Sequence, residues 1–124
     1  MSDRTVARII AALGKVRAPA MPGEYDIHGM IAEALKEDGL DFVHERPLAP
    51  RCRIDFFCGG VGIEVKKGRP APAQLRRQLA RYAASEEISA LIVVTQRAVS
   101  LPETICGKKL YQVSLNRNWG IALP

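Results

Sequence analysis

Two runs rich in Ile, Val and Phe flank the pair Gly59-Gly60, and this stretch from Arg53 to Lys66 constrains the fold more than any other part of the chain. A two-residue loop that contains glycine is a strong signal for a β-hairpin. With these glycines as the loop, Asp55 lies directly opposite Glu64. The sequence therefore predicts a hairpin in which two carboxylates face each other.

Side chains alternate between the two faces of a strand, so the predicted hairpin has a polar face and an apolar face. The polar face carries Arg53, Asp55, Phe57, Gly62, Glu64 and Lys66. The apolar face, expected to point into the core, carries Cys52, Ile54, Phe56, Cys58, Val61, Ile63 and Val65.

Two carboxylates directly opposite each other destabilise a sheet unless a cation lies between them. Arg53 and Lys66 are one source of positive charge, and a divalent metal ion is the other. The hypothesis that follows is a hard cation shared by Asp55 and Glu64, with Lys66 beside it. The alternative is a pair of solvated charges on an exposed sheet face, balanced by Arg53 and Lys66.

Composition frames this hypothesis. A chain of 124 residues, 48% hydrophobic and 25% charged, fits one soluble domain. The net charge of +5 permits a polyanionic partner. Three cysteines without a C-x-x-C pair predict buried free thiols at Cys52 and Cys58 and a reducing, cytoplasmic compartment. No apolar run is long enough for a membrane role to be expected.

Two helices and a strand are expected before the hairpin, over residues 3–15, 24–38 and 40–47. The predicted apolar stripes are Val6, Ile10 and Leu13 in the first helix and Ile27, Ile31 and Leu35 in the second. The first helix is an appendage for packing or for a partner subunit. Gly39 ends the second helix, and Pro47 halts the strand.

After the hairpin, a helix over 72–86 and a buried strand from Ile88 to Thr95 complete a parallel crossover. The inward stripe of this helix is Leu75, Leu79 and Tyr82 or Ala83. Residues 101–110 are expected to be a loop. A last hairpin is expected from 111–115 and 119–123, with Trp119 as a packing anchor. The single domain divides into an N-terminal helix and connector (1–22), a core (23–97) and a C-terminal segment (98–124).

The order α-β-β-β-α-β over roughly residues 24–96 resembles the PD-(D/E)xK nuclease superfamily. The hallmark of that superfamily is an Asp followed one strand later by (D/E)-x-K, which Asp55 and Glu64-Val65-Lys66 match. The position before the Asp is Ile54 here, where the pattern has proline. The segment Gln78-Leu79-Ala80-Arg81-Tyr82 is similar to the Q-x-x-x-Y element of RecB-type members.

The resemblance implies a restriction-endonuclease-like αβββαβ core with a mixed sheet flanked by helices, plus an extra N-terminal helix. It also implies a metal-dependent nuclease that hydrolyses nucleic acid, DNA above all, in the cytoplasm and with a homodimer as one arrangement. The implied catalytic residues are Asp55, Glu64, Lys66 and Gln78. The cofactor is Mg²⁺, or Mn²⁺, on Asp55, Glu64 and Glu24. The accessory residues are His28 and Tyr82, and the nucleic-acid-binding residues are Arg69, Arg76, Arg77 and Arg81.

Physical chemistry supports the same assignment without the family name. Mg²⁺ prefers carboxylate and water oxygens and usually takes one or two carboxylates together with substrate phosphate. Whether Glu24 or His28 completes the site stays open, because a first-turn acid also opposes the helix dipole and a histidine also packs. Tyr82 can instead be a core residue, with Gln78 a polar residue at the edge of the core. The arginines can instead form a solvated helix face.

Two other functions remain alternatives at this point. One is a non-catalytic nucleic-acid-binding or assembly protein that retains the nuclease fold. The other is an α/β domain of a different kind, whose Asp/Glu face binds a small phosphorylated ligand.

Overall fold

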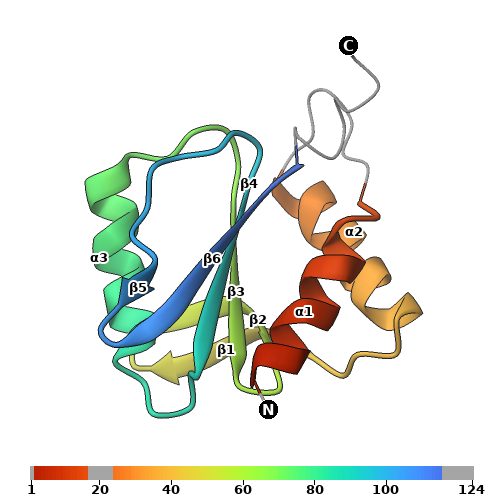
Figure 1. Cartoon of the computed structure of the whole chain (residues 1–124), viewed down its shortest axis with the longest axis horizontal. Coiled ribbons are helices and arrows are strands. Elements are labelled where there is room, and N and C mark those ends of the chain that lie inside the picture. The colour runs from red at the N-terminus through yellow and green to blue at the C-terminus, as the bar shows by residue number, and fades with distance from the viewer. Residues whose placement is uncertain (1, 17–23, 116–124) are drawn as a thin grey trace.

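A computed structural model describes residues 2–16 and 24–115, with the side chains of residues 2 and 24–26 excepted. The predicted strand over 119–123 and Trp119 lie outside these residues. The chain forms one mixed sheet, with α1 and α2 against one face and α3 against the other (Figure 1). The elements are α1 Ser2–Leu13, α2 Glu24–Glu37, β1 Val43–Ala49, β2 Cys52–Cys58, β3 Val61–Lys66, α3 Pro72–Ala83, β4 Ala90–Thr95, β5 Thr104–Ile105 and β6 Lys108–Ser114.

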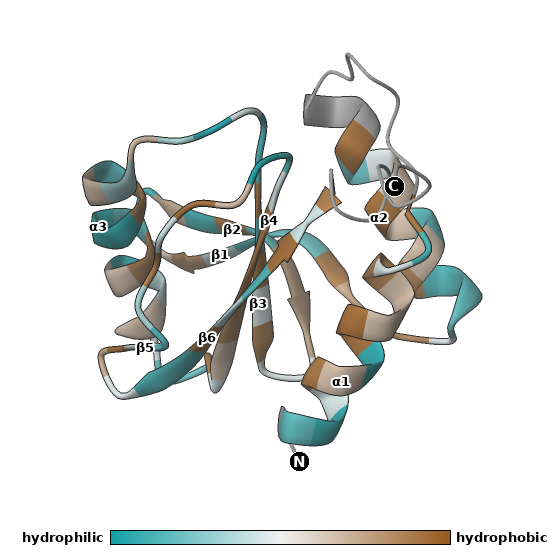
Figure 2. Ribbon diagram, turned by 45° about the horizontal axis from the view of Figure 1, so that its top comes forward, coloured by the Kyte–Doolittle hydropathy of each residue, from teal (hydrophilic) through white to brown (hydrophobic). Residues whose placement is uncertain are grey.

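The six strands are arranged in the order β1-β2-β3-β4-β6-β5. The pairs β3–β4 and β4–β6 are parallel and the other pairs are antiparallel. The predicted α/β class and mixed sheet are therefore confirmed. Figure 2 shows hydrophobic residues concentrated on the central strands between the helix layers, and hydrophilic residues on α3.

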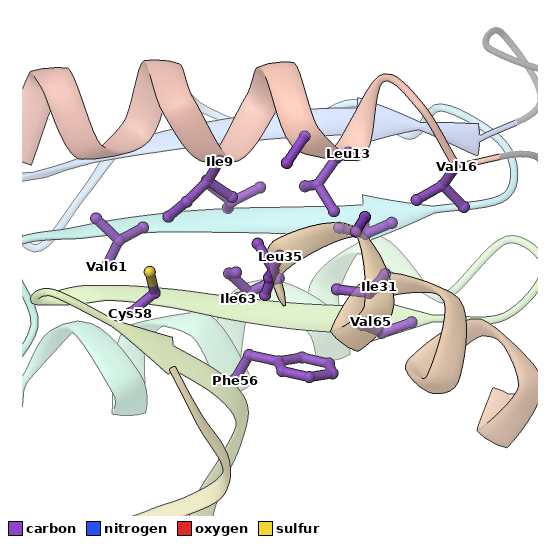
Figure 3. Close-up of a cluster of buried hydrophobic side chains, with 14 of the residues drawn as sticks. Ile9, Leu13, Val16, Ile31, Leu35, Phe56, Cys58, Val61, Ile63 and Val65 are labelled. Atoms are coloured by element: carbon purple, nitrogen blue, oxygen red, sulfur yellow. The ribbon is translucent and has the colours of Figure 1, made fainter. Parts of the chain in front are cut away.

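Helix α1 belongs to the core. Ile9, Leu13 and Val16 are buried together with side chains of α2 and β3 (Figure 3). Ile10, which the sequence placed on the inward stripe, is only partly buried, because Ile9 takes the central position. Between the two expected roles of this helix, the structure shows packing.

Helix α2 ends as predicted. Gly39 has a φ of 73°, a conformation in which glycine is favoured. Its N–H donates to Lys36 O at 3.0 Å, and the Leu40 N–H donates to Leu35 O at 2.9 Å. These two bonds form a Schellman motif that satisfies the last carbonyls of the helix.

Strand β1 runs through Pro47, so the prediction that this proline halts the strand is wrong. Pro47 pairs with Arg53 of β2. Since β1 is an edge strand, it has no neighbouring strand on one side. A residue without an N–H donor is tolerated on that side.

The hairpin loop at Gly59-Gly60 has the predicted register, with Phe57 opposite Gly62. The single apolar face is wrong, however. Phe56 packs under α1 and α2, whereas Ile54 packs in the cluster of α3. Figure 1 shows why: the β1–β2 ribbon crosses behind the other strands toward α3, so the first half of β2 turns toward that helix.

Helix α3 buries Leu75, Leu79, Tyr82 and Ala83 as predicted, although it ends at Ala83 rather than at residue 86. All six residues of β4 are buried, and the strand is parallel to β3.

The C-terminal segment differs from the prediction. Residues expected to be a loop form β5 and the start of β6, joined by a turn at Cys106-Gly107. Both turn residues have positive φ, 49° and 77°. Strand β6 extends the sheet next to β4.

Cys52 and Cys58 are buried free thiols, as predicted, and burial raises the pKa of Cys58. None of the helices in residues 2–16 and 24–115 combines the length and the apolar character needed to cross a membrane.

Candidate active site

The hairpin opens at the end away from its loop. The β2–β3 ladder consists of Cys58 with Val61, Phe57 with Gly62 and Phe56 with Ile63, and then stops. One step further, the Val65 N–H donates to Oδ2 of Asp55 at 2.8 Å. A carboxylate oxygen thus takes the hydrogen bond that a main-chain carbonyl accepts in a continuing ladder.

Tyr82 of α3 lies at the opening between the strands. Its hydroxyl donates to Arg53 O at 3.1 Å, on the part of β2 that has left β3. Burial, followed by the charge of Glu64, raises the pKa of Tyr82 above its ordinary value. The phenol therefore stays protonated and holds the opened strand to the helix.

Glu64 is a buried acid, with only 3% of its surface exposed. Its Oε2 lies 3.1 Å from Lys66 Nζ. Its Oε1 is buried and has no hydrogen-bond partner among the described residues. Burial and then the charge of Asp55 raise the pKa of Glu64 to about 7, against the opposing effects of Lys66 and Tyr82.

Two adjoining clefts flank this acid. The first, about 480 Å³ and called the acidic cleft, is lined by three acids, two arginines and two side chains of α3, among others: Glu45, Asp55, Glu64, Arg51, Arg53, Gln78 and Tyr82. The second, about 560 Å³, is lined by Lys66, Gln74, Arg77, Gln78 and Arg81 among others. Gln78 lines both, so an acidic cleft continues into a basic one along α3.

His28 of α2 reaches the site from the other side of the sheet. It is buried, with 7% of its surface exposed. Its Nε2 lies 3.6 Å from Asp55 Oδ2, and its Nδ1 lies 2.9 Å from Nε2 of His44 in β1.

The structure thus brings together most of the residues that the sequence proposed. Asp55, Glu64, Lys66, Gln78, Tyr82 and His28 meet around the opening, and Arg77 and Arg81 line the basic cleft. Arg69 and Arg76 are exposed and line neither cleft. Glu24 begins α2, and its side chain lies outside the described residues.

Sequence reasoning missed His44, Glu45 and Arg51. Glu45 is half-buried and lines the acidic cleft, as does Arg51. Both have positive φ, 58° and 60°, and such strained residues cluster at functional sites. Pro50 is a local signal for a turn that includes Arg51, whereas no local signal in the sequence indicates the conformation of Glu45.

The carboxylates suit a hard cation. In residues 2–16 and 24–115, no group of three or more His, Cys, Asp or Glu side chains is placed to hold a metal ion. Mg²⁺ needs fewer protein ligands than that, because it keeps several waters and takes one or two carboxylates. Asp55 and Glu64 line one cleft, and Oε1 of Glu64 is buried without a hydrogen-bond partner in the described part of the chain, so the pair fits this requirement.

The chain matches no protein-family model, no curated protein and no solved structure.

Proposed function

We propose that the protein is a metal-dependent nuclease of the PD-(D/E)xK type, which hydrolyses phosphodiester bonds of nucleic acid, DNA above all. The observation that carries the proposal is Glu64: a buried carboxylate with one oxygen on Lys66 and one without a hydrogen-bond partner among the described residues. A buried charge is costly unless it is paired. A divalent cation in the acidic cleft supplies the missing partner.

Asp55 and Glu64 are the residues that would hold Mg²⁺ or Mn²⁺ in this proposal. When bound, the cation lowers the pKa of a water and stabilises charge on the scissile phosphate. Lys66 lies between Glu64 and the basic cleft, where its ammonium group orients the attacking water and neutralises a phosphate oxygen.

The basic cleft accounts for the substrate class. Arg77 and Arg81 project from α3 beside Lys66, without a carboxylate among the residues that line this cleft. Arginine side chains bind phosphate oxygens by paired hydrogen bonds. The Gln78 amide, shared by the two clefts, can donate to a phosphate that spans them. A polyanion whose scissile phosphate lies at Glu64 and whose next phosphates lie along α3 fits this arrangement.

The direct test incubates the purified chain with single-stranded, duplex and branched DNA and RNA, with and without Mg²⁺ or Mn²⁺. Glu64→Ala and Lys66→Ala are compared with Glu33→Ala, an exposed acid of α2 as the matched control. We expect metal-dependent cleavage by the wild type and by Glu33→Ala only. Binding without cleavage would favour the non-catalytic alternative, and cleavage that survives Glu64→Ala would exclude this site.

A further inference from the structure

Two histidines link Asp55 to the edge strand of the sheet. Nε2 of His44 lies 2.9 Å from Nδ1 of His28, and Nε2 of His28 lies 3.6 Å from Oδ2 of Asp55. The same Oδ2 accepts the Val65 N–H at 2.8 Å. These contacts form a continuous path from β1 through α2 to the strand that carries Glu64.

The ring of Phe56 supports both imidazoles. His44 stacks on it with ring centroids 4.7 Å apart and an interplanar angle of 27°, and His28 lies against it at 5.5 Å. The two imidazoles meet edge to face at 5.2 Å. Stacking alone allows each imidazole to rotate by half a turn about its Cβ–Cγ bond. This rotation keeps the plane of the ring and exchanges the positions of its nitrogen and carbon atoms. The hydrogen bond between the rings is what selects one orientation.

The proton positions follow from the neighbours. The Asp55 carboxylate, 3.6 Å from Nε2 of His28, is too far for a hydrogen bond, but its negative charge favours the neutral tautomer that carries its hydrogen on Nε2. In a neutral imidazole the other nitrogen is then an acceptor. In that tautomer of His28, Nδ1 is the acceptor of the 2.9 Å hydrogen bond and Nε2–H of His44 is its donor.

We propose that His44 is a positioning residue for Asp55 and acts through His28. By donating to Nδ1, His44 holds His28 as the Nε2–H tautomer and keeps that N–H directed at Oδ2. The carboxylate is then held between the Val65 amide and the His28 ring, at the edge of the acidic cleft. The effect on catalysis rests on the proposed nuclease function, whereas the tautomer and the position of Asp55 do not.

Two substitutions separate the hydrogen bond from the packing. His44→Gln keeps an N–H donor on a side chain of similar reach but loses the ring. His44→Phe keeps a ring that can stack on Phe56 but has no donor. His44 is exposed on an edge strand, where substitutions are tolerated best. A hydrogen-bonding role predicts that glutamine replaces His44 and phenylalanine does not, and a packing role predicts the reverse.

The measurement is ¹⁵N-resolved NMR of the histidine rings and amide exchange of Val65 in the metal-free protein. We expect His28 of the wild type and of His44→Gln to carry its proton on Nε2. In His44→Phe we expect a mixture of tautomers and amide exchange of Val65 about tenfold faster, which corresponds to about 1.4 kcal/mol and is the order of one lost supporting hydrogen bond. In the cleavage assay, kcat of His44→Phe falls about tenfold with KM unchanged, as for other outer partners of metal-binding side chains.

A wild-type His28 with its proton on Nδ1 would overturn the proposal, and this result needs no variant. His44→Phe that matches the wild type while His44→Gln is impaired would overturn it as well. If the NMR results are as expected and the wild type cleaves nothing, the nuclease function fails and the positioning role stands.

Discussion

The β2–β3 hairpin has two halves with opposite roles: a loop half, next to Gly59-Gly60, and an open half, where the two strands separate. In the loop half, Phe56, Cys58, Val61 and Ile63 are buried and a regular ladder joins the strands. In the open half, the strands part, and a carboxylate and a tyrosine hydroxyl make the hydrogen bonds instead. The loop half stabilises the fold. The open half holds the buried carboxylate of Glu64 beside a cleft, which costs folding free energy.

The largest expected effect is in the open half. Asp55→Asn keeps an oxygen that accepts the Val65 N–H but loses the negative charge. We expect cleavage to fall by about a thousandfold, or roughly 4 kcal/mol in the barrier. We also expect the free energy of unfolding to stay within about 1 kcal/mol of the wild type. Asp55→Ala should lose both cleavage activity and stability, because the Val65 amide then has no acceptor. Equal free energies of unfolding of the two variants would show that the Asp55 carboxylate does not take the place of a main-chain acceptor in the ladder.

The pH dependence of stability is the next largest effect. The pKa of Glu64 is about 7 in the folded protein, above the ordinary 4.5. The folded state therefore binds more protons than the unfolded state between these values, and stability falls as the pH rises through that range. Between about pH 4.5 and about pH 8, this group removes roughly 3 kcal/mol from the free energy of unfolding of the metal-free protein. Urea titrations should show this fall in the wild type and no such fall in Glu64→Gln over the same pH range.

The loop half should respond to added volume. A Cβ on Gly62 would lie 2.4 Å from Cδ1 of Ile54 and 2.9 Å from Cδ1 of Ile88. We expect Gly62→Ala to lower the free energy of unfolding by about 2 kcal/mol through overpacking. Ile54→Val, which removes the nearest methyl group, should restore part of it. Gly29→Ala is the control, because a Cβ there meets nothing within 4 Å and alanine favours the helix.

The smallest expected effect is that of the tyrosine hydroxyl in the open half. Tyr82→Phe removes the donor to Arg53 O and leaves the ring in the core. The free energy of unfolding should fall by about 1 kcal/mol in a urea titration. A loss as large as that of Gly62→Ala would mean that the hydroxyl supports more than the opened strand.

Local signals explain what the sequence predicted well. Glycine marked the hairpin loop and the end of α2, and periodic leucines marked the buried face of α3. The loop predicted Asp55 directly opposite Glu64; the ladder ends one pair earlier, and the structure puts both residues in one cleft.

The failures have a common cause in long-range packing. Alternation predicted one apolar face for β2, but the coiling of the β1–β2 ribbon turns Ile54 toward α3. The contact between His44 and His28 joins an edge strand to a helix 16 residues earlier in the chain, and no local pattern encodes it. A strand over 111–115 was predicted, but the earlier start of β6 and its parallel pairing with β4 were missed, because β4 lies in another part of the sequence.

Calorimetric titration of the metal-free protein with Mn²⁺ at pH 7, in buffers of different ionisation enthalpy, tests the central claim most directly. With the pKa of Glu64 at about 7, we expect cation binding to release about half a proton, since a ligand must be deprotonated. Glu64→Gln should bind weakly and release none. Absence of binding by the wild type, or equal binding and proton release by Glu64→Gln, would contradict the account.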